Sequence, residues 1–434
     1  MADVLPTRSA IAASQLRQLR ALLSALTPAN RFYTEKFQAA GCPNPVTSLE
    51  EFSRRFPFTS KLELMEDQQR HPPYGTNLTF PLERYARCHQ TSGSKGTPIR
   101  WLDTPESWSW MLDHWERIYC AAGVTRADRV FFAFSFGPFI GFWLAFEAAA
   151  RLGCFCLPGG GLSSVARLRA IFDHGATALC CTPTYALRLA EVAAEEKMDL
   201  SGSRVRVIIV AGEPGGSIPA TRHRLEQLWP GARIFDHHGM TETGPVTYEC
   251  PARPGVLHVL ESGYLAEVID PATTRPVAPG DTGELVLTNL GRVGSPLLRY
   301  RTGDLVRPNS PAGISSGKPC ACGGFAVALA GGILGRTDDM VAVRGVNIYP
   351  SAVEDIIRDS GRVAEFQVQI STQQSLTELV VRIEPIAECR EVNALVRQLE
   401  KAFQLAFALR VPVRAVAPGT LPRFEMKAQR WMRI

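Results

Sequence analysis

The chain has 434 residues, of which 45% are hydrophobic and 21% charged, and its formal net charge is +5. These values are typical of a globular protein of two to three domains, long enough to bury a large core without disulfide bonds. The small net charge and the lack of a basic cluster exclude a nucleic-acid partner. The N-terminus has no apolar run after a basic start, so we expect no signal peptide and a cytoplasmic location.

The N-terminal part, residues 1 to about 80, is predicted to be a helical lead-in. The most apolar window follows at Val130–Phe146, where Gly137–Pro138 interrupts it and Glu147 closes it. A membrane span needs about 20 uninterrupted apolar residues. We therefore expect a buried strand, a turn and a buried helix here, and no membrane partner.

Strand-like and helical patterns alternate through the middle of the chain. Apolar runs begin at Arg129, Cys154, Ala178, Val205 and Ala232, and helical patterns cover residues 185–197 and 220–229. Continuous apolar strands between helices predict an α/β fold with a parallel, doubly wound sheet. From about residue 264 to 307 only short strand patterns remain, which predicts an appended β-subdomain at about 264–334.

The last part of the chain is predicted to be a small α+β domain at 338–434, after an N-terminal core at 1–337. Ser351 and Glu354 have capping-box spacing, so a helix is expected to begin there. Residues 365–371 and 378–384 alternate as strands do. A helical face at the end is formed by Val392, Leu395, Val396, Leu399 and Phe403.

The segment "TSGSKGTP", Thr91–Pro98, combines hydroxyl groups, glycines and one lysine. Glycines allow close approach to a ligand, and exposed amides bind anions, so this loop could hold phosphates. It has neither the Walker nor the G-x-G-x-x-G spacing. Taken alone, it is equally compatible with a solvated turn.

Four further segments follow in order: "HHGMTETG" from His237, "LLRYRTGD" ending at Asp304, "GRTDDMVAVRGVNIYPSAVE" from Gly335, and "LPRFEMKAQR" close to the C-terminus. With the first loop, they resemble the adenylate-forming superfamily of acyl-CoA ligases, adenylation domains and luciferases. The short length, "AGEP" and "CTPTYAL" narrow the resemblance to the phenylacetate–CoA ligase family. The resemblance covers about Tyr85 to Arg430.

The resemblance implies an ATP- and Mg²⁺-dependent aryl-CoA ligase. Such an enzyme converts a carboxylate into an acyl-AMP, and the thiol of coenzyme A then displaces AMP. Candidate acids are 2-aminobenzoate, other benzoates and phenylacetate. Loading of an acyl carrier protein, or a non-catalytic nucleotide- and zinc-binding role, stays open as an alternative, and so does a homodimer.

The resemblance also assigns roles to individual residues. Thr241 would hold the α-phosphate, Glu242 the Mg²⁺ and Asp304 the ribose, while Lys427 would bridge the carboxylate and the α-phosphate. Lys427 follows Met426, where the family often has glycine. Asp338 would be the hinge of a mobile C-terminal domain. The remaining nucleotide contacts would come from Thr91, Ser92, Gly93, Ser94, Lys95, Gly96, Thr97, Glu213, Pro214, Asp236 and Arg336; for Glu213 the main chain could matter more than the carboxylate.

Two histidines depart from the family pattern. His238 stands where the family commonly has a tyrosine that stacks on adenine, and an imidazole can stack with less area. His237 stands where an apolar residue usually lines the acyl pocket, so it either contacts a polar ring substituent or is an inert buried histidine. The other pocket candidates, some of which could equally be core residues, are Phe136, Phe139, Phe142, Tyr185, Gly212, Gly239 and Pro245.

Cys250, His258, Cys320 and Cys322 form a candidate metal site. Three cysteines and one histidine suit a closed, tetrahedral structural zinc site. Spacing alone leaves this open, because C-x-C is less diagnostic than C-x-x-C. The resemblance favours structural Zn²⁺, since relatives carry a Cys/His pair and a C-x-C-G segment at these places.

Overall fold

The computed structural model describes residues 5–91, 98–309, 319–339, 341–343, 346–373, 376–424 and 428–434. The chain divides into two compact units, each built from separate stretches of sequence. The first unit contains residues 1–160 and 236–333, and the second contains 161–235 and 334–434. The second unit therefore combines the C-terminal segment with part of the middle of the chain, and the predicted division into 1–337 and 338–434 stays a prediction.

The first unit begins with the helical lead-in that the sequence predicts. Its helices are α1 (Arg8–Leu26), α2 (Arg31–Ala39), α3 (Leu49–Arg55) and α4 (Lys61–Arg70). Thr7, Asn30, Ser48 and Ser60 cap them, each through a side-chain oxygen that accepts a backbone N–H of the first turn. The 3₁₀ turn η1 (Leu82–Arg84) leads into an antiparallel pair, β1 (Arg87–Gln90) and β2 (Arg100–Asp103).

The apolar window at 130–146 is a strand, a turn and a helix, as expected. Helix α5 (Pro105–Ala121) precedes β3 (Arg129–Phe132), which pairs in parallel with β4 (Phe155–Pro158), and α6 (Ile140–Leu152) connects the two. Helices α5 and α6 pack against each other. Within the described residues, no helix is long and apolar enough to cross a membrane.

The rest of the first unit is built from antiparallel strands. They are β8 (Gly239–Met240), β9 (Gly244–Pro245), β10 (Thr247–Glu249), β11 (Val256–Val259), β12 (Tyr264–Ile269), β13 (Gly283–Asn289), β14 (Tyr300–Val306) and β15 (Ala328–Ala330). Strands β12, β13 and β14 form one antiparallel sheet, and β10, β11 and β15 form another. The expected β-subdomain is thus present.

The second unit contains helices α7 (Ser164–Asp173), α8 (Pro183–Glu195) and α9 (Pro219–Leu228) around β5 (Ala178–Cys181), β6 (Val207–Val210) and β7 (Arg233–Asp236). A 3₁₀ turn, η2 (Leu200–Gly202), leads into β6. Strands β5 and β6 are parallel, and both are fully buried. Buried parallel strands with helices between them confirm the α/β fold class that the apolar runs predicted.

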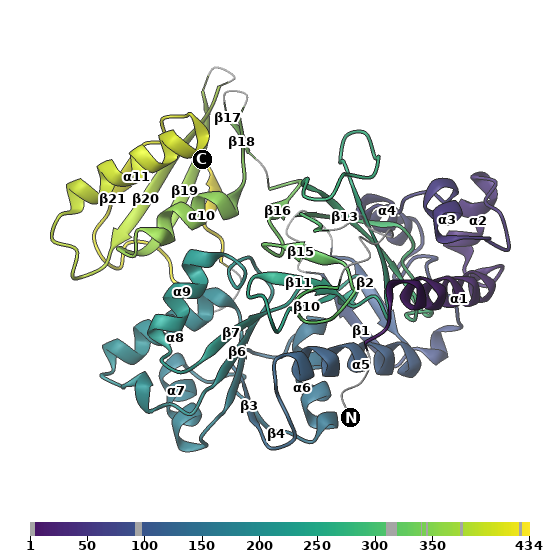
Figure 1. Ribbon diagram of the computed structural model, residues 1–434, viewed down its shortest axis with the longest axis horizontal. Helices are drawn as coiled ribbons and strands as arrows, with labels where there is room; N and C mark the ends of the chain where they lie inside the picture. Colours follow the sequence, from purple (N-terminus) through teal and green to yellow (C-terminus); the bar gives the residue numbers. More distant parts are fainter. Residues whose placement is uncertain are drawn as a thin grey trace. The chain divides into compact units, whose positions relative to one another are not determined.

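The C-terminal part of this unit is the predicted α+β arrangement. Strands β19 (Val363–Gln373) and β20 (Leu376–Pro385) form a long hairpin, flanked by β22 (Trp431–Arg433) and β21 (Val413–Ala415). Helices α10 (Pro350–Asp359) and α11 (Val392–Phe407) pack on this sheet, and α11 buries Leu395, Leu399 and Phe403 (Figure 1). Short strands β16 (Gly335–Arg336), β17 (Val341–Val343) and β18 (Val346–Ile348) lead into it.

The predicted start of α10, with Ser351 at the N-cap, is wrong by two positions. Tyr349 occupies the N-cap, Pro350 is the first helical residue, and no side chain caps the helix. The Ser351 hydroxyl instead donates to the carbonyl of Leu334. Proline at the first helical position sets the start, because its fixed φ suits a helix and its missing N–H costs nothing there.

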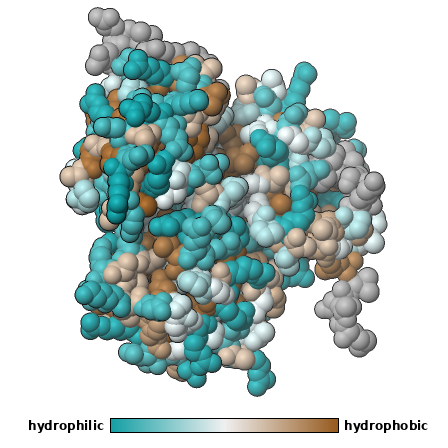
Figure 2. Space-filling model, turned by 60° about the vertical axis from the view of Figure 1, so that its left-hand side comes forward, coloured by the Kyte–Doolittle hydropathy of each residue, from teal (hydrophilic) through white to brown (hydrophobic). Residues whose placement is uncertain are grey.

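The surface of the molecule is mixed. On the face in Figure 2, hydrophilic residues predominate, and apolar residues occur in small groups between them. Isolated apolar residues on a surface are normal for a globular protein, and only a large continuous patch would indicate a binding face.

Candidate functional site

The "HHGMTETG" segment forms a tight hairpin in the first unit. Strands β8 and β9 pair antiparallel, with Gly239 opposite Pro245 and Met240 opposite Gly244, so Thr241 and Glu242 lie at its turn. Both glycines are required: a Cβ at Gly239 would lie 2.8 Å from the Gly244 carbonyl oxygen, and Gly244 has a φ of +82°, which side chains rarely adopt. The hairpin presents the side chains predicted to hold phosphate and Mg²⁺.

The Glu242 carboxylate is buried beside a cation. Its Oε1 lies 3.1 Å from Nζ of Lys61, a residue of α4 that is about half exposed. Thr241 is half-buried beside it. A buried carboxylate whose present partner is an exposed lysine can exchange that partner for a metal ion, so the arrangement fits the predicted Mg²⁺ role.

His238 and Asp304 lie together, although 65 positions separate them in the sequence. The His238 Nε2 is 3.1 Å from the Asp304 Oδ2. The backbone N–H of His238 donates to the Thr247 hydroxyl at 2.8 Å, and that of Asp304 donates to the Thr302 hydroxyl at 3.0 Å. The structure thus brings the residue predicted at adenine next to the residue predicted at ribose. Asp236, the last residue of β7, is also buried and donates its backbone N–H to Glu249.

His237 is buried against α5. Its ring meets the Trp115 ring edge-on, with 4.5 Å between the centroids. Burial lowers the pKa of His237 to about 3, so the imidazole is neutral at ordinary pH. Its Nδ1 has no hydrogen-bond partner among the described residues. A buried polar atom without a protein partner is uncommon.

Aromatic side chains gather at the start of α6, beside this hairpin. Helix α6 packs against β8 and β9. Phe134 and Phe142 stack with 4.2 Å between ring centroids, and Phe136 lies 4.9 Å from Trp143. Phe136, Phe139 and Phe142 are only half-buried, and Pro245 in β9 is buried. The predicted acyl-pocket aromatics of the first unit therefore lie in α6 and in the segment just before it, and α6 contacts the hairpin.

Thr91 closes the base of the first predicted phosphate loop. It exchanges two hydrogen bonds with Ile99: its N–H donates to the Ile99 carbonyl, and its hydroxyl accepts from the Ile99 N–H, both at 3.0 Å. The loop itself, Ser92, Gly93, Ser94, Lys95, Gly96 and Thr97, lies outside the described residues. Lys427 also lies outside them.

In the second unit, Glu213 joins two separate segments. Its Oε1 accepts from the Thr184 N–H at 2.9 Å, in the first turn of α8, and its Oε2 accepts from the Ala428 N–H at 2.8 Å. Gly212, at φ +93°, and Pro214 beside it are exposed. The carboxylate of Glu213 thus caps a helix and holds the residue that follows Lys427 in the sequence.

Three other predicted residues belong to the second unit. Tyr185 is a buried core residue of α8, and its hydroxyl lies 2.9 Å from the Ser164 hydroxyl. Arg336 and Asp338 form an ion pair of 2.9 Å at the start of the C-terminal segment.

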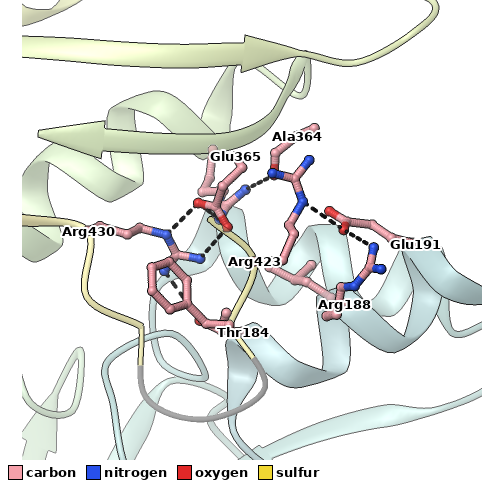
Figure 3. Close-up of a pocket in the computed structure, with 10 residues that line it drawn as sticks. Thr184, Arg188, Glu191, Ala364, Glu365, Arg423 and Arg430 are labelled. Carbon is pink, nitrogen blue, oxygen red and sulfur yellow. Dashed lines mark hydrogen bonds and ion pairs between the residues drawn. The ribbon is translucent and has the colours of Figure 1, made fainter. Parts of the chain in front are cut away.

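Next to Ala428, Arg430 is bound into a buried ionic cluster (Figure 3). Its guanidinium donates to both Glu365 oxygens, at 2.6 and 3.1 Å, and to the Thr184 hydroxyl at 3.3 Å. Burial alone would raise the pKa of Glu365, but Arg430 and Arg358 lower it below its usual value. Arg423 contacts Glu191 of α8 at 3.4 Å and Glu384 at 2.7 Å. Arginines on both sides of residues 425–427 are therefore anchored within this unit.

The four predicted metal ligands come together. The ligand atoms of Cys250, His258, Cys320 and Cys322 all lie within 4.8 Å of one another. The sulfurs of Cys250 and Cys320 are 3.7 Å apart, and the Cys322 sulfur is 3.5 Å from His258 Nε2. His258 Nδ1 lies 3.2 Å from the Ala326 carbonyl oxygen. A tetrahedral zinc site needs this donor set, and a carbonyl behind the histidine fixes its ring nitrogen.

Sequence reasoning missed Arg292 and Asp103. They form a fully buried ion pair under the hairpin, at 2.7 Å. Neither residue belongs to a quoted motif, and they are 189 positions apart. Only the fold reveals that they meet.

Comparison with known proteins agrees with this geometry. The AMP-binding enzyme family matches residues 77–291, and the AMP-binding enzyme C-terminal domain matches residues 345–432. The phenylacetate–coenzyme A ligase of Pseudomonas putida is 30% identical over 95% of this chain and 92% of its own. That of Thermus thermophilus is 29% identical over 98% and 96%.

Solved structures of adenylate-forming enzymes share the fold. A 2-hydroxyisobutyryl-CoA ligase in the postadenylation state, in complex with 2-HIB-AMP, has a TM-score of 0.90 and 28% identity, covering 98% of this chain and 89% of its own. The anthranilate CoA ligase AuaEII has a TM-score of 0.61 and 18% identity, over 97% and 90% of the two chains, and shows the fold alone. The chain therefore belongs to the phenylacetate–coenzyme A ligase family of AMP-binding enzymes, and it is an adenylate-forming acyl-CoA ligase.

Proposed function

We propose that this ligase activates an aromatic carboxylate and transfers it to coenzyme A. The observation that carries the proposal is the set of half-buried aromatic side chains on and before α6, which packs against the β8–β9 hairpin. Flat rings gain from stacking and edge-on contacts with such side chains. Relatives named phenylacetate–coenzyme A ligase support the same substrate class.

The reaction proceeds in two steps, adenylation and thioester formation. The carboxylate oxygen attacks the α-phosphorus of ATP, and pyrophosphate leaves, which gives an acyl-AMP. The thiol sulfur then attacks the acyl carbon, AMP leaves, and the thiol loses its proton. The first step brings two anions together, so it needs cations and hydrogen-bond donors around the phosphates.

In our proposal, Thr241 holds the α-phosphate, Glu242 holds Mg²⁺, and Asp304 accepts hydrogen bonds from the ribose. Lys427 provides the ammonium for the first step. Asp338 is the hinge that lets residues 338–434 serve the second step, because a hinge needs only a few positions that change φ and ψ.

We also propose that the Cys₃His group binds one structural Zn²⁺. The donor set, the separations between the ligand atoms and the carbonyl behind His258 support it. A closed site of this kind stabilises the fold and leaves no position open for a substrate.

An ATP–pyrophosphate exchange assay tests the proposal. The acids are 2-aminobenzoate, benzoate, phenylacetate and, because of the structural similarity, 2-hydroxyisobutyrate. We expect exchange with an aromatic acid, and thioester formation when coenzyme A is added. Preference for 2-hydroxyisobutyrate would overturn the aromatic assignment. If the enzyme catalyses exchange and transfers the acyl group to an acyl carrier protein but not to coenzyme A, the carrier protein is the acceptor and the coenzyme A assignment is wrong.

Lys427→Ala separates the two steps. It should lose most of the exchange rate, because the lysine serves only the charge-crowded first step. Thioester formation from supplied acyl-AMP should stay close to that of the wild type. Equal loss in both half-reactions, with the fold intact, would contradict the role of Lys427.

A further inference from the structure

Arg292 makes an unusual set of contacts beneath the β8–β9 hairpin. Its Nη1 donates to the carbonyl oxygens of Thr241, at 2.9 Å, and Glu242, at 2.8 Å. Its Nε and Nη2 each donate to one oxygen of Asp103, both at 2.7 Å. The Arg292 guanidinium thus donates to two successive main-chain carbonyls, and its other nitrogens donate to the Asp103 carboxylate.

A third successive carbonyl is held in the same way. The Tyr264 hydroxyl donates to the Thr243 carbonyl at 2.8 Å, and the Asn289 side-chain amide donates to it at 3.2 Å. The main-chain carbonyl of each of the three residues Thr241, Glu242 and Thr243 therefore accepts at least one hydrogen bond from a buried side chain. Side chains on a backbone held this tightly have few alternative directions, which is what a phosphate or metal site requires.

The ion pair has no exposed surface: the side chains of Arg292 and Asp103 are both 0% exposed. Burying two charges costs so much that such a pair is often no more stabilising than an apolar pair of the same size. Stability therefore does not explain why the pair is there. The hydrogen bonds from Arg292 to the hairpin explain the presence of the pair, because an apolar side chain could not donate to the two carbonyls.

We infer that Arg292 is a positioning residue for adenylation, which orients Thr241 and Glu242 through their main chain and is itself oriented by Asp103. The inference rests on the proposed roles of Thr241 and Glu242 at the phosphates and Mg²⁺. Arg292 touches no reacting atom. Its effect is expected to be largest in the step that uses ATP and Mg²⁺, because both Thr241 and Glu242 serve that step. The displacement of AMP by a thiol uses only the contact of Thr241 with the α-phosphate, so we expect a smaller effect there.

The test compares Arg292→Lys with a matched control, Arg299→Lys. Arg299 also makes a buried bidentate pair, with Glu267 at 3.0 and 2.8 Å, and also donates to a carbonyl, that of Phe56. That carbonyl is not part of the hairpin. Lysine is a single point donor and cannot reproduce either fork, so both variants should lose similar thermal stability.

We expect Arg292→Lys to lower ATP–pyrophosphate exchange about 10- to 100-fold and to raise the Mg²⁺ concentration needed for half-maximal rate. Thioester formation from supplied acyl-AMP should fall clearly less, by about tenfold at most, because it needs neither Mg²⁺ nor Glu242. In Arg299→Lys, the exchange rate and the Mg²⁺ concentration needed for half-maximal rate should both stay within about threefold of the wild-type values. Equal loss of both half-reactions in Arg292→Lys, or equal effects of the two variants, would overturn the inference.

Two additions keep the test decisive. If Arg292→Lys does not fold, Tyr264→Phe removes one donor to the Thr243 carbonyl without burying a charge. It should lower exchange more than thioester formation. Affinity for Mg-ATP without any acid is also measured, and Arg292→Lys should weaken it about tenfold. If the wild type activates none of the acids, the proposed substrate class fails, while unchanged Mg-ATP affinity in the variant would defeat the positioning role separately.

Discussion

His237 is the residue whose environment bears most directly on substrate choice. It is buried, its Nδ1 has no hydrogen-bond partner among the described residues, and it lies between the end of β7 and the hairpin. An acid with an amino or hydroxyl substituent could pair with that nitrogen, whereas a plain ring would leave it unpaired. An unpaired buried group costs about 1–3 kcal/mol, which corresponds to roughly tenfold or more in discrimination.

We therefore expect 2-aminobenzoate or a hydroxybenzoate to exceed phenylacetate in kcat/KM, and His237→Ile to narrow or reverse that order. The pKa of about 3 means that protonation begins only as the pH falls far below neutrality. The wild-type substrate ratio should accordingly stay constant between about pH 6 and 8. A variant with altered stability and an unchanged ratio would show that His237 only packs against Trp115.

At the same scale, sequence reasoning identified the residues that lie on motifs and missed those that support them. His238 and Asp304 were assigned separately to one nucleotide, and the fold places them 3.1 Å apart. Arg292 and Asp103 could not be found, because a lone arginine and a lone aspartate carry no pattern and are usually solvated. Ser351 misled for the opposite reason: its spacing to Glu354 imitates a capping box, yet Pro350 begins the helix.

Among the elements, the start of α8 has a double function that its sequence does not reveal. Thr182 caps the helix through its hydroxyl, which accepts from the Tyr185 N–H at 3.1 Å. Glu213 adds a second cap at Thr184 and also holds Ala428. The same carboxylate thus stabilises a helix and attaches the segment that carries Lys427.

Glu213→Gln should affect adenylation more than stability. A glutamine keeps one acceptor oxygen for Thr184 but presents an NH₂ group to the Ala428 N–H, and two donors cannot pair. We expect exchange to fall about tenfold, with thioester formation from supplied acyl-AMP nearly unchanged.

Thr182→Ala is the control for this prediction, because it loosens the same helix end without touching Ala428. It should cost about 1 kcal/mol of stability and little activity. If the two variants lost exchange activity equally, Glu213 would be a helix cap and nothing more.

The elements themselves were largely predictable. The apolar runs at 178 and 205 became β5 and β6, because short continuous apolar runs are typical of strands buried on both faces. The helical face from Val392 became α11, because apolar residues with a period of 3.6 indicate a helix with one buried face. What could not be predicted was which elements meet. Pairing of the C-terminal segment with α8 depends on single charged residues such as Arg423 and Arg430, which repeat no pattern.

For the molecule as a whole, the Cys₃His group is the most direct prediction to check. Protein purified without chelator should contain about one zinc per chain. Metal binding of this kind contributes to folding energy, so Cys322→Ser should lower Tm by about 5 °C or more before it changes the chemistry.

Cys389→Ser serves as the control for the metal site, since Cys389 is equally half-buried but lies outside the group. It should keep both the metal and the Tm. Elemental analysis that found no zinc in the wild-type protein would refute the site.

The discontinuous second unit has a consequence for synthesis. Residues 161–235 are synthesised about a hundred positions before residues 334–434. During that interval the early residues lack the rest of their unit. The face that α8 offers to the late segment carries Thr184, Arg188 and Glu191, which are polar or charged, and one apolar residue, Leu187. Water can solvate such a face during the delay, whereas an apolar one would invite aggregation. The ionic character of this junction thus suits a nascent chain whose halves meet late.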